Sequence, residues 1–188
     1  MQQTDGSLYV LFHASRENDV YREYRPYRVQ AGGGDIERVH DAFGSFPAQN
    51  PGDGRMLFSR GGYYEGWDRR HFRGPETSDV WLQDKEGDFS QLTTWPGNDG
   101  KAKWSGESSF LYLSDREDRC VNLYRQQLER RGEEPRRLTS YKDHDILDFD
   151  VSRDGRTAVL HTWEGLSILH LGRSSQLPVV IEIRASED

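Results

Sequence analysis

The chain has 188 residues, of which 32 are acidic and 25 are basic, so its formal net charge is −7. This length fits one ordinary domain or a piece of a larger protein. The acidic balance argues against general nucleic-acid binding, which needs an excess of Lys and Arg on one face. The single cysteine, Cys120, cannot form an internal disulfide, and no Cys/His array with zinc-ligand spacing is present.

No membrane or targeting segment is visible in the sequence. Residues 1–6 lack a charged region followed by an apolar one, and the longest apolar runs, such as Leu8 to Phe12, are far too short to cross a bilayer. We therefore expect no membrane contact and a cytoplasmic location, with the periplasm left open.

Short apolar segments bounded by turn residues follow one another along the whole chain. The 19 Gly, 7 Pro and 12% aromatic residues, with only 2 Met, favour β structure over helix. The segments fall into groups of four, and an Asp-Gly turn at residues 53–54 and again at 154–155 suggests a reversal between one group and the next. The expected units are residues 7–50, 53–105 with an insertion at 61–77, 108–152, and 154–188 with only three segments.

Recurrence of a four-segment unit without intervening helices predicts an all-β fold, a β-propeller of four-stranded antiparallel blades. About four blades are present, so we expect an incomplete ring. A β-sandwich is the alternative, but it does not require the same marks to recur in register. Four tryptophans on strands or strand ends are expected in the core between blades: Trp81, Trp95, Trp104 and Trp163.

The third unit carries the most distinctive motif. It runs Leu113-Ser-Asp-Arg116, then Val121-Asn-Leu-Tyr124, then Arg137-Leu-Thr139, and ends at a Ser152-Arg-Asp-Gly155 turn. This order resembles the TolB-type propeller repeat. Tyr63 to Gly74, Ser78 to Leu82 and Leu92 to Asp99 are similar, more narrowly, to the N-terminal propeller of tricorn-type serine peptidases. The resemblance covers roughly residues 55–172.

The resemblance implies a role without catalysis in this chain. In tricorn-type peptidases the catalytic residues belong to a separate C-terminal part, so none is carried over and we expect no enzyme activity here. The implied function is scaffolding or gating of peptide access, with the remaining blades and the catalytic domain of the parent chain as partners. The alternative is a free-standing TolB-like module that binds other proteins.

The insertion at residues 61–77 is the candidate binding site. Long loops on a rigid scaffold often carry binding, and this one combines aromatic rings with guanidinium groups that suit peptide carboxylates or a neighbouring subunit. The candidate residues are Tyr63, Tyr64, Trp67, Arg69, Arg70 and Arg73. The rings could equally fold back and cap the blade.

Other candidate sites are better explained by structure. We expect no cofactor and no metal, because Asp143-His144-Asp145 is more typical of a turn than of a metal site. The cluster of Arg130, Arg131, Arg136 and Arg137 is interleaved with Glu, which indicates a solvated hairpin rim. Unpaired strand edges and apolar flanks of an incomplete ring would favour a homo-oligomer.

Overall fold

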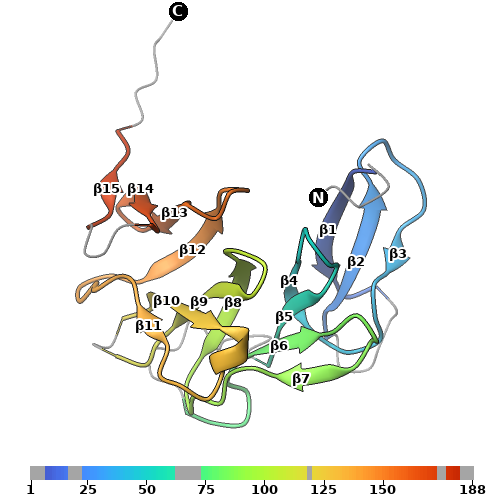
Figure 1. Ribbon diagram of the computed structural model, residues 1–188, viewed down its shortest axis with the longest axis horizontal. Coiled ribbons are helices and arrows are strands. Elements are labelled where there is room, and N and C mark those ends of the chain that lie inside the picture. Colours follow the sequence, from blue (N-terminus) through green and yellow to red (C-terminus); the bar gives the residue numbers. More distant parts are fainter. Residues whose placement is uncertain (1–6, 17–22, 62–72, 118–119, 173–176, 183–188) are drawn as a thin grey trace, which may run out of the picture.

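The computed structural model describes residues 7–16, 23–61, 73–117, 120–172 and 177–182. Its strands form four antiparallel sheets, one of three strands and three of four. Figure 1 shows the sheets arranged in sequence around a common centre, with an open side between the first and the last. This is the arrangement of blades in a β-propeller, so the predicted fold is confirmed, and the described residues form an incomplete ring. No helix in the described part of the chain could cross a membrane.

Strands follow chain order within every sheet. The first sheet contains β1 (Tyr9–Ala14), β2 (Arg25–Gln30) and β3 (Glu37–Arg38). The second contains β4 (Ser45–Gln49), β5 (Met56–Arg60), β6 (Asp79–Gln83) and β7 (Phe89–Gln91). The third contains β8 (Asp99–Trp104), β9 (Ser109–Ser114), β10 (Asn122–Gln127) and β11 (Arg136–Arg137), with a short helical turn η1 (Leu128–Arg130) after β10. The fourth contains β12 (Ile146–Val151), β13 (Thr157–Thr162), β14 (Gly165–His170) and β15 (Val179–Val180).

The sheets are offset by one strand from the expected units. Strands β4, β8 and β12 were each expected to close a unit, and each instead opens the next sheet. The Asp-Gly turns explain the difference, because they join β4 to β5 and β12 to β13, which are hydrogen-bonded neighbours in one sheet. In both turns the Asp carboxylate, of Asp53 or Asp154, accepts the N–H two residues further on. A tight turn of this kind connects paired strands, so the second, third and fourth blades each begin one strand earlier than expected.

The third sheet is buried on both faces. Leu111 and Leu113 face the fourth sheet, and Phe110 and Tyr112 face the second, as the alternation of a strand requires. The expectation for the tryptophans holds for Trp104, which is buried in the core with the second sheet. It is wrong for Trp163, whose side chain is 78% exposed. Trp163 lies in the tight turn between β13 and β14, on the last described sheet, where no further sheet packs.

The first strands of the second, third and fourth sheets, β4, β8 and β12, are called the inner strands here. Each contains a one-residue bulge near its start. In two of them a bulge residue has a left-handed backbone, with φ of 52° at Phe46 and 53° at Lys101. The N–H of Phe46 donates to Nδ1 of His13 (3.1 Å), and the N–H of Lys101 donates to Oγ of Ser59 (2.8 Å). The bulges of β4 and β8 therefore bind these two strands to β1 and β5 of the preceding sheets.

Candidate functional site

The linkers between sheets are fixed by a repeated set of hydrogen bonds. In the linker 92–98, Leu92 N–H donates to Val80 O, and Thr93 Oγ1 accepts the Val80 N–H at 2.9 Å. In the linker 138–145, Leu138 and Thr139 make the same two bonds to Leu123. The Leu-Thr pair noted in the sequence therefore binds the start of each linker to the third strand of the sheet before it. It satisfies both backbone groups of one residue in the third strand.

Of the six candidate binding residues, the structure describes only Arg73. Tyr63, Tyr64, Trp67, Arg69 and Arg70 lie outside the described residues. Arg73 donates through Nη1 to Asp115 Oδ2 at 2.9 Å, and its guanidinium lies 5.4 Å from the centre of the Trp95 ring. The end of the insertion is thus attached to the third sheet and to the linker 92–98. Whether the loop binds a partner stays a prediction.

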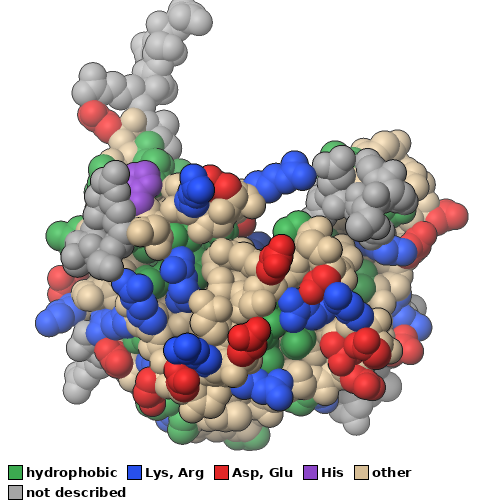
Figure 2. All heavy atoms as spheres, in the orientation of Figure 1, with side chains coloured by type: hydrophobic (Ala, Val, Ile, Leu, Met, Phe, Trp, Pro, Cys, Tyr) green, Lys and Arg blue, Asp and Glu red, His purple; other side chains and the backbone are tan. Residues whose placement is uncertain are grey.

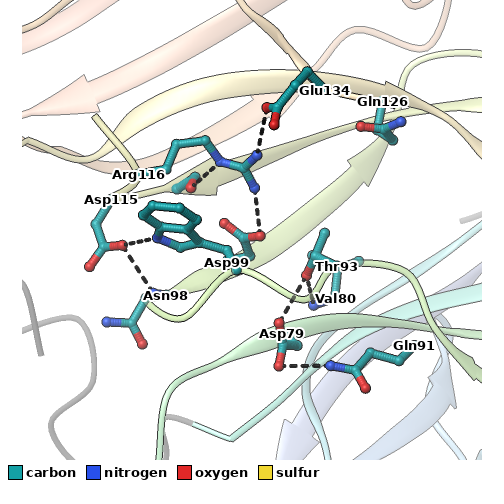
Figure 3. Close-up of polar contacts among 12 residues, drawn as sticks. Asp79, Val80, Gln91, Thr93, Asn98, Asp99, Asp115, Arg116, Gln126 and Glu134 are labelled. Carbon is teal, nitrogen blue, oxygen red and sulfur yellow. Dashed lines mark hydrogen bonds and ion pairs between the residues drawn. The ribbon is translucent and has the colours of Figure 1, made fainter. Parts of the chain in front are cut away.

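Asp115 is the centre of that attachment (Figure 3). Its side chain is 5% exposed, and its Oδ1 accepts both the indole N–H of Trp95 at 3.0 Å and the backbone N–H of Asn98 at 3.1 Å. A side chain at Gly97 would collide with Asp115, Arg73 and Trp95 together, so the close approach of these groups requires glycine there.

Arg116 forms a second attachment, deeper between the sheets. Its Nη2 donates to Asp99 Oδ2 at 2.8 Å, and its Nε donates to Ser114 Oγ at 2.9 Å. The guanidinium lies within 6 Å of the centres of three rings, those of Trp95, Tyr112 and Tyr124. Asp99 has no exposed surface. Burial raises its pKa to about 6, although the Arg116 charge opposes the rise.

Asp79 begins β6 beside this cluster. It accepts hydrogen bonds from the Thr93 hydroxyl at 3.2 Å and from the Gln91 amide at 3.0 Å. Burial raises its pKa to about 6, and the bonds from Thr93 and Gln91 oppose the rise. Figure 3 shows Asp79, which is on β6, between Gln91 of β7 and Thr93 of the linker between the second and third sheets. The hydrogen bonds to Asp79, Asp99 and Asp115 together hold the linker 92–98 and the described end of the insertion in one geometry.

The Ser-Asp-Arg motif now has a structural explanation. Ser114 accepts a hydrogen bond from Arg116, Arg116 binds Asp99, and Asp115 binds the linker and Arg73. Sequence reasoning identified the motif by resemblance but assigned it no role. The elements that it joins are separated along the chain, so only the sheet order could have indicated the contacts.

The remaining candidates behave as turns or core residues. Asp145 Oδ1 accepts the Val121 N–H at 2.8 Å, which is a structural contact of the linker 138–145. No group of three or more metal-ligating side chains occurs among the residues that the structure describes. Cys120 is 1% exposed, as expected for a small buried side chain.

Radial four-stranded sheets joined by such linkers define a β-propeller, and comparison with solved structures agrees. The chain is similar to tricorn protease with a TM-score of 0.58 and 15% identity, covering 96% of this chain and 22% of that one. It is similar to TolB from Acinetobacter baumannii with a TM-score of 0.62 and 17% identity, covering 89% and 45%. A third match is the propeller domain of the Trilobed protease from Pyrococcus furiosus, described as having an open velcro topology, with a TM-score of 0.54, 14% identity and coverage of 90% and 50%.

These likenesses show the fold of tricorn and TolB propellers, as the sequence resemblance implied. The chain spans between about a fifth and a half of the length of these three proteins. No family model matches the sequence, and no curated protein matches it.

Proposed function

We propose that this chain is a non-catalytic propeller segment of a tricorn-like peptidase, where it scaffolds or gates the access of peptides to a catalytic module. The observation that carries the proposal is the attachment of the insertion 61–77. Arg73, next to the aromatic and basic stretch, is fixed to Asp115 and Trp95 on a rigid linker. The described end of the insertion is therefore held in place by the third sheet, and long loops on a rigid scaffold often carry binding. The similarity to tricorn and Trilobed protease propellers supports the proposal.

A second candidate function is a TolB-like module that binds proteins and serves no peptidase. The similarity to TolB supports it equally well. The coding sequence that flanks this segment separates the two, because PDZ-like and peptidase regions downstream belong only to the first. Under both proposals the partner is a peptide or a protein. The location we propose is the cytoplasm, with the periplasm left open.

Binding by the insertion can be tested with a fluorescently labelled unfolded polypeptide and anisotropy measurements. We expect the double variant Arg69→Ala/Arg70→Ala to bind about tenfold more weakly, which is the effect of losing one or two charge-assisted hydrogen bonds. The matched control is Arg130→Ala/Arg131→Ala, which removes the same charge from the hairpin between β10 and β11. Equal binding by the two double variants would contradict the proposed site.

The same preparation tests the absence of catalysis. Unfolded polypeptide and fluorogenic peptides should stay intact after long incubation, and a serine-hydrolase probe should label the chain no more than a boiled sample. Labelling above that background would overturn the non-catalytic assignment while leaving the binding site untouched.

A further inference from the structure

Two arginines of the third sheet stand directly opposite each other without a carboxylate between them. In the pairing of β10 with β11, Arg125 is the cross-strand partner of Arg136. Their side chains therefore project from the same face of the sheet. Like charges in this position destabilise a sheet. In a chain with an excess of acidic residues, such a pair needs an explanation.

The neighbouring arginines have acidic partners. Arg137 pairs with Glu117 at 2.6 Å, and Arg130 pairs with Glu133 at 3.7 Å. The contact between Arg130 and Glu133, both exposed, agrees with the solvated rim expected for this hairpin. Arg136 differs, because its side chain makes no hydrogen bond or ion pair with any residue that the structure describes.

Arg125 is the more buried member of the pair. One of its terminal nitrogens donates to the carbonyl oxygen of Leu171 at 3.4 Å, which ties it to the end of the fourth sheet. Its Nε is buried and has no hydrogen-bond partner. Burial, and then the charge of Arg136, lowers the pKa of Arg125. A buried donor without an acceptor costs free energy, and the cost is larger for a charged group.

An oxyanion placed between the two guanidinium groups removes both penalties. It accepts the Arg125 Nε–H, and it neutralises the repulsion across the strand pair. The planar guanidinium matches a carboxylate or a phosphate by two parallel hydrogen bonds. Figure 2 shows Lys and Arg side chains gathered over the region where Figure 1 draws β10 and β11.

We propose that Arg125 and Arg136 form an oxyanion-binding site between the third and fourth sheets. Its ligand is either free phosphate or the carboxylate of a docked acidic peptide, two sources of the same chemistry. The site is separate from the insertion 61–77, so it does not depend on the function proposed above. The expectation of a solvated rim holds for the exposed side chains of Arg130 and Arg136 and is wrong for Arg137, whose side chain is only 20% exposed.

The test uses the whole chain at constant ionic strength in chloride. Inorganic phosphate, acetyl-Ala-Glu-Ala-amide and acetyl-Ala-Gln-Ala-amide are titrated in parallel, and binding is followed by the NMR signal of the Arg125 Nε–H. We expect a saturable shift with phosphate, with the Glu peptide, or with both, and none with the Gln peptide. Phosphate alone identifies a phosphate site, and the Glu peptide identifies a carboxylate site. No saturable shift with either anion overturns the proposal.

Two variants separate the site from general charge. Arg136→Gln should weaken anion binding at least tenfold. The same variant should melt at a higher temperature than the wild type in chloride, because the repulsion is gone. Arg131→Gln removes the same charge from an exposed position in the same hairpin and should bind like the wild type. Equal weakening by both variants would mean that only the overall charge matters, which contradicts a site.

Discussion

The linker 92–98 and the linker 39–44 occupy the same place in successive sheets, yet they use different residues. Both start with a backbone bond to the strand before the last one of the sheet, from Leu92 to Val80 O on β6 and from Val39 to Pro26 O on β2. The next residue is Thr93 in one and His40 in the other. Thr93 accepts the N–H of Val80, whereas Pro26 has no N–H to offer.

His40 is accordingly a packing residue. It is 7% exposed, its ring lies 4.8 Å from that of Phe58 and 5.2 Å from that of Phe89, and neither ring nitrogen has a hydrogen-bond partner of ordinary geometry. The difference teaches that the linker residue is determined by the strand opposite it. Where the strand has a buried N–H, the linker supplies a hydroxyl, and where proline removes the N–H, an aromatic ring fills the space.

The largest effect is expected from breaking the linker 92–98 at Asp115. The variant Asp115→Ala leaves the buried N–H of Asn98 and the indole N–H of Trp95 without their acceptor. We expect the free energy of unfolding to fall by about 3 kcal/mol, measured by urea denaturation. Asp41→Ala is the matched control in the linker 39–44, where the carboxylate is 86% exposed and pairs only with Arg38. Similar losses in both variants would show that the two linkers do not differ in this way.

A smaller loss is expected from Thr93→Val, which keeps the shape of the side chain and removes the acceptor for the Val80 N–H. An unpaired buried N–H costs about 1 to 3 kcal/mol, so the free energy of unfolding should fall by about 2 kcal/mol. Thr94→Val, at an exposed neighbouring position, serves as the control. If Thr93→Val is as stable as the wild type, the Thr93 hydroxyl does not stabilise the linker.

The smallest effect is a change in pH dependence for His40→Leu. Burial lowers the pKa of His40 to about 4. Between pH 6.5 and 4 the unfolded chain therefore gains a proton that the folded chain refuses, and stability falls as the pH falls. Burial raises the pKa of Asp99 to about 6, which has the opposite sign over nearly the same interval.

Removing His40 leaves the contributions of Asp99 and Asp79, whose pKa values burial raises, opposed among the described residues only by that of His13, whose pKa burial lowers. From pH 7 to pH 4.5, the melting temperature of His40→Leu should rise relative to that of the wild type. At pH 7 the two should differ little, because the variant replaces an unpaired buried imidazole with an aliphatic side chain. Parallel melting curves across this interval would show that His40 is not the group that titrates.

The strands could be predicted because each is a short apolar run between turn residues, and the Leu-Thr and Ser-Arg marks recur with them. The blade boundaries could not, because the turn at Asp53-Gly54 and the linker at Pro96-Gly97 have the same turn-forming composition. Only the pairing of β4 with β5 separates a turn within a sheet from a linker between sheets.

The sequence did not indicate the contacts that the candidate residues make. Arg73 was singled out as part of the insertion, but its bond to Asp115 joins residues far apart in the chain. The opposition of Arg125 and Arg136 depends on the register of β10 and β11, which a shift of one residue would abolish. Neither relation leaves a local pattern in the sequence.

The bulges of β4, β8 and β12 bear on how such a ring is lengthened by gene duplication or by engineering. Because the bulge residues of β4 and β8 each bond to the sheet before them, a copied blade needs a matching acceptor on the preceding blade, as Lys101 needs Ser59. A duplication whose ends fall in the linkers carries both donor and acceptor to every new junction. One whose ends fall inside a sheet separates them, so the linkers are the places at which this propeller can be cut and extended.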